Sequence, residues 1–246
     1  MSLPPPGPVP PQHGRPPAGY RTLVMAKAPV AGRVKTRLGA DVGLDVAAHL
    51  AAAALLDTLE ACTSAVGASS CHLALDGDLD EAVEHEALRE ALVGWSVTPQ
   101  RGEDFAARLV AAHDDAGPGV VVQVGMDTPH LTPALLDAAA VPLLLDAPPE
   151  ARYDAVLGPA LDGGWWVLAR RDPAVAAVLD GVEMSTERTG ADTRAALEAA
   201  GWRVAGTAAL LDVDAVADAD AVAAEAPGTR FARAWVEAPR LTGERA

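Results

Sequence analysis

Aromatic residues and cysteines are scarce in this chain of 246 residues. It has two Phe, two Tyr and five Trp, and alanine supplies much of its 50% hydrophobic content. We therefore expect helices that pack closely through small side chains. Its two cysteines, Cys62 and Cys71, have neither metal-ligand nor redox spacing. They are predicted to be reduced residues in or near the core of a cytoplasmic protein.

Positive charge is also in short supply. The chain has 19 lysines and arginines against 34 acidic residues, which gives a formal net charge of −15. Such a surface repels the phosphates of nucleic acids and of anionic lipids, so a general nucleic-acid or membrane-surface function is disfavoured. No uninterrupted apolar run reaches the roughly 18 residues of a membrane span. We expect neither a nucleic-acid partner nor a membrane span.

The two ends of the chain lack the patterns of folded structure. Residues 1–19 are rich in Pro and Gly, and they have neither a helical period nor the apolar core of a signal peptide. The sequence predicts a disordered leader over residues 1–19, a single domain over residues 20–238 and a frayed tail over residues 239–246.

Within the domain, short β-rich apolar runs alternate with longer alanine- and leucine-rich segments. This alternation predicts a three-layer α/β/α fold with a mainly parallel central sheet, in which ligands bind beyond the carboxyl ends of the strands. The apolar run 119–127 is typical of a central strand buried on both faces. The predicted strands are 22–28, 71–76, 95–100, 119–127, two segments within 153–170, and 202–207. The predicted helices are 44–66, 79–92, 103–116, one from about 132, 173–179, 191–200 and one from about 218.

A cationic stretch, VMAKAPVAGRVKTRLG, follows the first predicted strand. Its four cations are Lys27, Arg33, Lys35 and Arg37. Pro29 and Gly32 prevent a helix from beginning at once, which leaves a loop that can wrap a phosphate with its N–H groups while the cations neutralise it. A solvated basic loop is an equal alternative from charge pattern alone. The stretch lacks the Gly-Lys-Ser/Thr ending of a Walker motif.

Aspartates fall at further predicted strand ends. Asp127 ends the buried strand in VGMDTPHL, where a carboxylate is costly unless it is solvated, hydrogen-bonded or bound to a metal. Asp212 and Asp214 lie on the same face of an extended segment and can converge on one metal ion. The structural alternatives are an Asp127 that caps the following turn and an acidic helix N-terminus, which fits Asp218 best.

The stretch GPALDGGWW combines an acid, two glycines and two tryptophans. Gly163 and Gly164, next to Asp162, let the backbone approach a ligand closely. Trp165 and Trp166 face opposite sides of a strand, so both cannot line one pocket. One is expected in the core and the other could stack on a ligand, although packing alone is an alternative for either.

Five segments occur in the order found in a bacterial family of glycosyltransferase A-fold proteins: AKAPVAGRVKTRL, VGMDTPHL, GPALDGGWWVLA, MSTERTGADTRAAL and LLDVDAVADAD. The resemblance covers about residues 22–222. The family is a domain of unknown function within the nucleotide-diphospho-sugar transferase superfamily, and some members are assigned to arsenosugar biosynthesis as glycosyltransferases. The first segment is also similar to that of 2-phospholactate guanylyltransferases, which share the fold.

This resemblance implies roles for individual residues. Asp127 would be the metal-binding acid after the central strand, with Asp212 as a second metal-side acid and Mg²⁺ or Mn²⁺ as the cofactor. Lys35 and Arg37 would act with Asp127 in catalysis. The phosphate-binding loop would comprise Lys27, Pro29, Gly32, Arg33, Lys35 and Arg37. The acceptor side would comprise Asp162, Gly163, Gly164 and Trp165.

The sequence therefore predicts a cytoplasmic, metal-dependent transferase that uses a nucleotide-activated donor and a small-molecule acceptor. Glycosyl transfer from a nucleoside diphosphate sugar is narrowly favoured by the family. Nucleotidyl transfer to a phosphorylated small molecule, with release of pyrophosphate, is the alternative, because four cations in one loop suit a triphosphate. A non-catalytic nucleotide-binding protein is a further alternative, because a fold does not establish a reaction. The family usually has a glycine before the arginine at position 108, where this chain has Ala106-Ala107, and a tryptophan where this chain has Met184.

Overall fold

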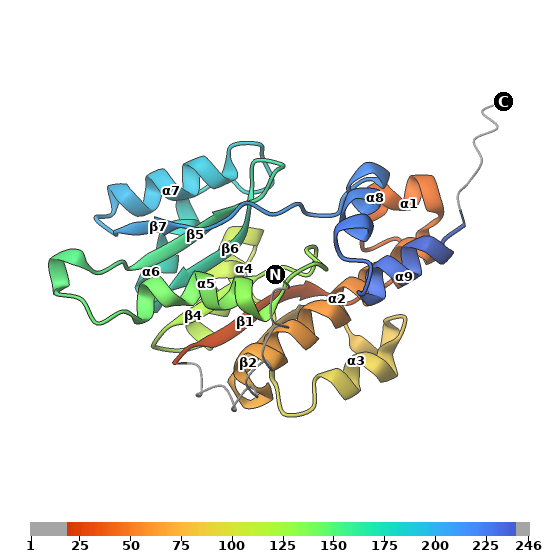
Figure 1. Ribbon diagram of the computed structural model, residues 1–246, viewed down its shortest axis with the longest axis horizontal. Helices are drawn as coiled ribbons and strands as arrows, with labels where there is room; N and C mark the ends of the chain where they lie inside the picture. The colour runs from red at the N-terminus through yellow and green to blue at the C-terminus, as the bar shows by residue number, and fades with distance from the viewer. Residues whose placement is uncertain (1–18, 240–246) are drawn as a thin grey trace, which may run out of the picture.

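The first strand, β1 (Arg21–Lys27), lies inside a sheet of seven strands in the computed structural model, which describes residues 19–239 (Figure 1). The predicted leader and tail, apart from Gly19 and Pro239, lie outside the described residues. The strand order is β3-β2-β1-β4-β6-β5-β7. The other strands are β2 (Cys71–Asp76), β3 (Ser96–Pro99), β4 (Val121–Val124), β5 (Ala155–Pro159), β6 (Trp165–Arg170) and β7 (Val204–Gly206).

The sheet is parallel except at β6, which runs antiparallel to both β4 and β5 among the described strands. β1 pairs in parallel with β2 on one side and with β4 on the other. The strand order therefore reverses between β1 and β4. In open α/β sheets the crevice for ligands forms at such a reversal, outside the carboxyl ends of the strands.

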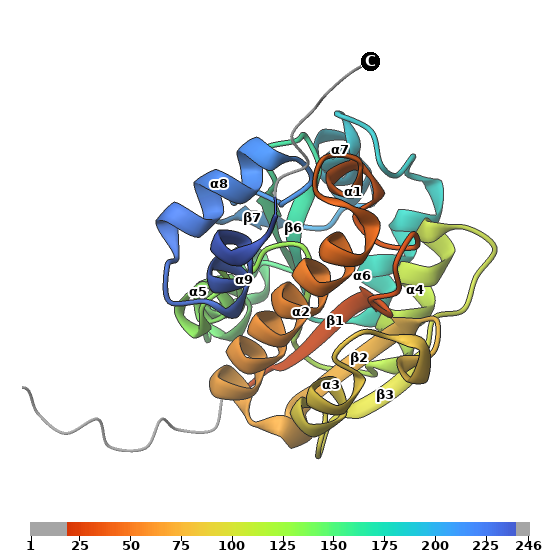
Figure 2. The same ribbon diagram turned by 90° about the vertical axis from the view of Figure 1, so that its right-hand side faces the viewer.

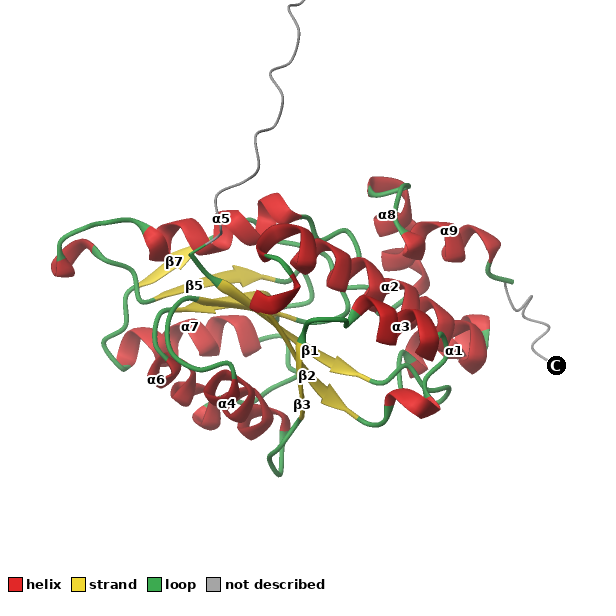
Figure 3. Cartoon of the chain, turned by 90° about the horizontal axis from the view of Figure 1, so that it is seen from below, coloured by secondary structure: helices red, strands yellow, loops and turns green. Residues whose placement is uncertain are grey.

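Helices cover both faces of the sheet, as the expected three layers require (Figure 3). One face carries α2 (Leu44–Val66), α3 (His85–Ala91) and α5 (Pro133–Leu144). The opposite face carries α4 (Phe105–Asp115), α6 (Pro173–Ala176) and α7 (Thr189–Ala199). The short 3₁₀ segments are η1 (Ala68–Ser70), η2 (Leu79–Glu81), η3 (Pro149–Ala151) and η4 (Ala177–Gly181).

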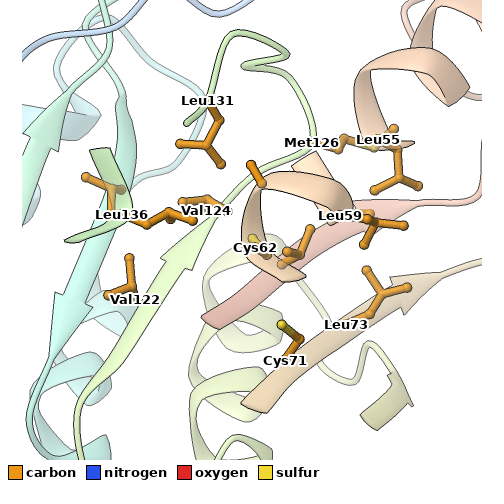
Figure 4. Close-up of a cluster of buried hydrophobic side chains, with 14 of the residues drawn as sticks. Leu55, Leu59, Cys62, Cys71, Leu73, Val122, Val124, Met126, Leu131 and Leu136 are labelled. Atoms are coloured by element: carbon orange, nitrogen blue, oxygen red, sulfur yellow. The ribbon is translucent and has the colours of Figure 1, made fainter. Parts of the chain in front are cut away.

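A core of buried apolar side chains lies beneath α2 (Figure 4). Leu55, Leu59 and Cys62 of α2 face Leu73 of β2, and all four are buried. Cys71, which begins β2, is also buried, and both cysteines are free thiols. The expectation of reduced core cysteines is confirmed. Burial raises the pKa of the Cys71 thiol to about 11, so it stays a neutral core group.

Among residues 19–239, one helix has the length and hydropathy of a membrane span. It is α2, with 23 residues, and 72% of its most apolar window is buried inside the protein. A core helix of a globular protein has this same composition, because its apolar side chains face other protein segments rather than lipid.

A separate group of helices adjoins α2 near the carboxyl ends of the strands. The helices α8 (Val216–Glu225) and α9 (Arg230–Glu237) pack with α2 and with α1 (Thr36–Val42) around Phe231 and Trp235 (Figure 2). Asp57 of α2 accepts hydrogen bonds from the backbone N–H groups of Arg230 and Phe231, at 3.0 and 2.9 Å. This buried carboxylate satisfies the free N–H groups at the start of α9 and holds that helix in place.

The predicted elements agree with the structure with several exceptions. Helix α1 forms where no helix was predicted, the expected helix 173–179 continues as η4 after Ala176, and the strand expected over 119–127 is β4 over Val121–Val124 only. The expected helix 79–92 is divided into η2 and α3, because Glu84 has a left-handed backbone with φ 56° and the Val83 N–H bonds to the carbonyl of Pro29 instead. Helix α9 lies where the sequence pattern predicts no helix. The start of α5 is as predicted, since the Thr132 hydroxyl accepts a hydrogen bond from the Leu135 N–H and Pro133 begins the helix.

Candidate active site

A cavity of about 460 Å³ opens where the strand order reverses, beyond the carboxyl ends of β1 and β4. This volume is in the range of small-molecule sites. Among the described residues its wall holds equal numbers of cations and carboxylates, although the whole chain carries a net charge of −15. The lining cations are Lys27, Arg33, Lys35 and Arg37, and the lining carboxylates are Asp127, Asp162, Asp212 and Asp214.

Lys35 is the innermost of the four cations. Its ammonium lies 2.6 Å from Asp127 Oδ1 and 3.0 Å from Asp214 Oδ1, and its side chain is only 8% exposed. Its backbone has φ 46°, a left-handed conformation, immediately before α1 begins at Thr36. Burial lowers the pKa of Lys35, but the charges of Asp127 and Asp214 outweigh it and raise the pKa above its ordinary value. Lys35 therefore stays charged and holds two carboxylates together.

The other three cations differ in whether they form ion pairs with carboxylates. Arg33 donates to Glu81 at 2.7 Å on the surface, where both side chains are mainly exposed. Arg37 is 3.8 Å from Asp214 and its side chain is 85% exposed. Lys27 ends β1 and has no ion pair with any residue in the range 19–239. Lys27 and Arg37 are thus the cations that can move onto an anionic ligand at least cost.

The backbone of Asp127 is hydrogen-bonded to the segment that contains Asp212 and Asp214. Asp127 follows β4 by three residues, and its carbonyl accepts a hydrogen bond from the Val213 N–H at 3.0 Å. That bond brings the residues flanking Val213, which are Asp212 and Asp214, to the end of β4. The Asp127 side chain contacts Lys35 and is 43% exposed. It forms an ion pair in the cavity wall, which differs from the alternative in which it caps the next turn.

Asp212 and Asp214 occupy different surroundings. Burial, followed by the charges of Asp127 and Asp162, raises the pKa of Asp212 to about 7. Asp214 is half exposed and bonds to Lys35. Asp218 accepts hydrogen bonds from the N–H groups of Asp214 and Ala215 at the start of α8. The capping alternative therefore describes Asp218, and leaves Asp212 and Asp214 available to the cavity.

The carboxylates suit a divalent cation that a ligand shares. Among residues 19–239 no group of three or more His, Cys, Asp or Glu side chains forms a complete metal site. Mg²⁺ is usually held by one or two carboxylates together with phosphate oxygens and water. The raised pKa of Asp212 shows that its charge and that of Asp127 are close enough to repel. A hard cation relieves such repulsion, so Asp127 and Asp212 fit one when phosphates complete its coordination.

A second part of the lining, here named the apolar end, consists of Phe105, Leu109, Trp165 and Met184. Trp165 and Met184 pack against the buried cluster that contains Leu109, whereas Phe105 is 45% exposed. Helical spacing predicts that Phe105 and Leu109 lie on one face of this helix; Phe105 begins α4, and both residues line the cavity. Thr186 and Thr189 are the nearby polar groups in the lining.

Two glycines join the segment before α7 to the Asp162-Gly163-Gly164 turn. A Cβ at Gly163 would lie 2.1 Å from the Glu187 carbonyl oxygen, and one at Gly190 would lie 2.4 Å from the carbonyl oxygen of Gly164. Gly163 also has φ 95°, which favours glycine. Gly163 was predicted to let the backbone approach a ligand closely. In the structure it lets the backbone approach the segment that contains Glu187.

Most predicted site residues line the cavity, and three do not. Pro29, Gly32 and Gly163 lie outside the wall; Gly32 shapes the loop with φ 78°. The expectation that Trp165 and Trp166 cannot both line one pocket is wrong, because both contribute to the lining. Trp166 is the core residue of the pair: it is 2% exposed and donates through Nε1 to the Ala208 carbonyl.

Sequence reasoning missed several lining residues, namely Gln100, Phe105, Gln123 and Met184. Each comes from a different element and none belongs to a charged motif, so the local pattern carried no sign of it. A large apolar residue at the first position of a helix just beyond a strand end was the available signal for Phe105.

The family model described as "Uncharacterized protein conserved in bacteria (DUF2064)" matches residues 58–186. The chain belongs to this family. The match begins within α2 and extends through the Asp127 and Asp162 segments to Thr186. The expected relationship is confirmed, and the cationic loop lies just before the matched region. No curated protein matches the sequence.

Solved structures agree with this assignment. A protein of Desulfovibrio desulfuricans G20, provisionally assigned as a nucleotide-diphospho-sugar transferase, is 28% identical with a TM-score of 0.73; the match covers 89% of this chain and 93% of that one. A cytidylyltransferase of Leptospira borgpetersenii is 14% identical with a TM-score of 0.54, covering 81% of this chain and 83% of that one.

A further similar structure is CMP:2-keto-3-deoxy-manno-octonic acid synthetase in complex with CTP. It is 13% identical with a TM-score of 0.51, and the match covers 85% of this chain and 99% of that one. At such identities the last two likenesses concern the fold alone. They confirm the expected fold, and the 28% identity to the Desulfovibrio protein, together with the family match, places the chain among transferases of the nucleotide-diphospho-sugar transferase superfamily.

Proposed function

We propose that this protein transfers a sugar from a nucleoside diphosphate sugar to a small acceptor, with Mg²⁺ or Mn²⁺ as cofactor. The observation that supports the proposal is the composition of one cavity. Four cations of residues 27–37 and a set of four carboxylates face the same space at the reversal point of the sheet. A diphosphate needs cations along its oxygens, and a phosphate-bound divalent metal needs carboxylates beside them.

The charged end of the cavity would bind the donor diphosphate. Lys27 and Arg37, which are the least engaged cations, would contact the outer phosphate oxygens, and Lys35 would contact the inner ones beside Asp127. Asp127 and Asp212 would hold the metal ion, which when bound neutralises charge that develops on the leaving diphosphate. The role of Lys35 and Arg37 in catalysis is the same stabilisation of charge by fixed cations.

The reaction needs no protein nucleophile. A hydroxyl oxygen of the acceptor forms a bond to the anomeric carbon of the sugar, and the bond from that carbon to the diphosphate oxygen breaks. The nucleoside diphosphate leaves with the bonding electron pair. The hydroxyl proton passes to a carboxylate or to water, and Asp162 is the lining carboxylate in the turn that precedes Trp165.

Nucleotidyl transfer is a second candidate because the short stretch 27–37 supplies all four lining cations among the described residues. That charge exceeds what a diphosphate needs and suits a triphosphate. In this reaction an acceptor phosphate oxygen bonds to the α-phosphorus, and pyrophosphate leaves. The fold is compatible with either reaction, so the product has to decide between them.

A ligand screen followed by product analysis tests the proposal. Nucleotide sugars and nucleoside triphosphates are each added with and without Mg²⁺ or Mn²⁺, and the melting temperature is recorded, since a ligand that binds the native state raises it. We expect a metal-dependent rise with a nucleotide sugar, and release of nucleoside diphosphate on turnover. A rise with one triphosphate, and release of pyrophosphate, favours the second candidate. Tight binding without turnover across a broad acceptor panel indicates a binding protein.

A further inference from the structure

We propose that the apolar end of the cavity is an acceptor subsite for an uncharged molecule that presents an apolar ring or chain beside its reacting hydroxyl. The identification of this ligand as an acceptor rests on the proposed function. The preference for an uncharged, apolar ligand follows from the side chains of the wall. Three observations support it: the distribution of charge, the state of two aromatic side chains, and the rigidity of the segment that carries Met184.

Among the described residues, the elements that form the apolar end supply none of the lining cations. All the lining cations come from residues 27–37. The arginines that follow in α4 and before α7 are engaged elsewhere: Arg108 bonds to Asp76 at 3.0 Å and Arg188 bonds to Asp192 at 3.3 Å, and neither lines the cavity. Asp162 supplies a negative charge beside Trp165. A phosphorylated or carboxylated acceptor would meet repulsion here and no cation to offset it.

The two aromatic rings of this wall are available to a ligand. Phe105 is 45% exposed, lines the cavity and is not one of the buried core residues. Trp165 packs beside the core, and its Nε1 has no hydrogen-bond acceptor among residues 19–239. Its neighbour Trp166 is fixed by the bond to Ala208. The indole of Trp165 is thus held by packing alone, and apolar contact with a ligand removes exposed aromatic surface from water.

The segment that contributes Met184 is already in place without a ligand. The Thr189 hydroxyl donates to the Glu183 carbonyl at 3.0 Å and accepts from the Thr186 N–H at 3.0 Å. The Gly190 N–H donates to the Gly163 carbonyl at 2.9 Å. These bonds surround Met184, so the wall is preformed and selects its ligand by shape and polarity at little ordering cost.

The test compares three probes that share one sugar: phenyl β-D-glucoside, glucose and glucose 6-phosphate. Their dissociation constants for the full chain are measured by calorimetry, and ring contacts are detected by saturation-transfer NMR. We expect the phenyl glucoside to bind about tenfold or more tightly than glucose, because the phenyl ring is buried. We expect glucose 6-phosphate to bind no more tightly than glucose. Tighter binding of glucose 6-phosphate, or no binding of the phenyl glucoside, overturns the proposal.

Two variants locate the effect. Phe105→Ala should weaken phenyl glucoside binding about tenfold. Leu161→Ala is the matched control, because Leu161 is 67% exposed, adjoins Asp162 in the chain and does not line the cavity. It should leave the dissociation constant unchanged. Equal binding by the Phe105 variant and the wild type, with both folded by circular dichroism, also overturns the proposal.

Pyrophosphate binding in the presence of Mg²⁺, measured on the same samples, separates this inference from the proposed function. It should be the same in the Phe105→Ala variant and in the wild type. If the wild type binds the phenyl glucoside through Phe105 but does not bind pyrophosphate, the donor proposal fails and the apolar subsite stands. If pyrophosphate binds and the phenyl glucoside does not, the subsite fails and the donor proposal stands.

Discussion

The two ends of the cavity are built in opposite ways. At the charged end, the short stretch 27–37 supplies the cations, and Lys35 is already bonded to Asp127 and Asp214. At the apolar end, the side chains come from α4, β6 and the segment before α7, and Phe105 and Trp165 have no polar partner to exchange among the described residues. A ligand must therefore replace existing bonds at the charged end, whereas it only covers surface at the apolar end.

This difference separates two tasks. The cations would contact phosphate oxygens, which donors with different bases and sugars have in common, so these contacts alone do not distinguish one donor from another. An apolar wall of fixed shape distinguishes acceptors by size and polarity. The comparison predicts that substitutions at the charged end affect turnover or donor binding, and that substitutions at the apolar end affect the acceptor alone.

The largest effect is expected for Asp127→Ala. This change removes one of the two proposed metal ligands and a partner of Lys35, so we expect turnover to fall about a thousandfold or more, as loss of several kcal/mol of charge stabilisation requires. The measurement is kcat with the donor identified by the ligand screen. The fold should remain, because the side chain is 43% exposed and the Asp127 carbonyl still accepts from Val213. A folded variant with wild-type kcat contradicts the metal assignment.

Lys35→Met is expected to shift two ligands in opposite directions. Pyrophosphate with saturating Mg²⁺ should bind about 10- to 100-fold more weakly, because a charge-assisted contact is lost. Mn²⁺ alone should bind more tightly than to the wild type, because no ammonium then neutralises Asp127 and Asp214. Both affinities are measured by calorimetry. A parallel loss of both indicates that Lys35 supports the fold of the loop and does not compete with the metal.

The same contrast explains what could be predicted from the sequence. The charged end is local in sequence, so the stretch 24–39 and the acids at the strand ends are recognisable from the order of residues alone. The fold follows from alternating strands and helices, and from signals such as Thr132 and Pro133 at the start of α5. These patterns act over a few residues and keep their meaning in almost any context.

The apolar end depends on contacts that no local pattern encodes. Helical spacing assigns Phe105 and Leu109 to one face of α4, but spacing identifies a face and not what lies opposite it. Met184 reaches the cavity only because Gly190 lets its segment pack against Gly164. Lys35 belongs to the predicted phosphate loop, but its pairing with Asp214, at a separation of 179 residues, depends on the path of the chain after β7.

Gly190→Ala should damage the apolar end selectively. The new Cβ would lie 2.4 Å from the Gly164 carbonyl oxygen, so the segment that carries Met184 has to shift. We expect the phenyl glucoside to bind about tenfold more weakly, pyrophosphate to bind as before, and stability to fall by about 1–3 kcal/mol. Gly181→Ala is the control, since a Cβ there has no atom within 4 Å. Equal probe affinities in both variants, measured by calorimetry, would show that the wall tolerates the shift.

The smallest effects on pyrophosphate binding are expected for substitutions of Lys27 and Arg33. Which of the two substitutions weakens binding more is informative. Lys27 is unpaired among the described residues, whereas Arg33 already bonds to Glu81 on the surface. Lys27→Gln should therefore weaken pyrophosphate binding about fivefold and Arg33→Gln about twofold, which is the scale of single exposed charges. Both losses should shrink at high salt, because screening weakens contacts between exposed charges. Calorimetric titrations at two ionic strengths measure this. A larger loss for Arg33→Gln implies that Arg33 leaves Glu81 when the phosphates bind, and the loop then closes over its ligand.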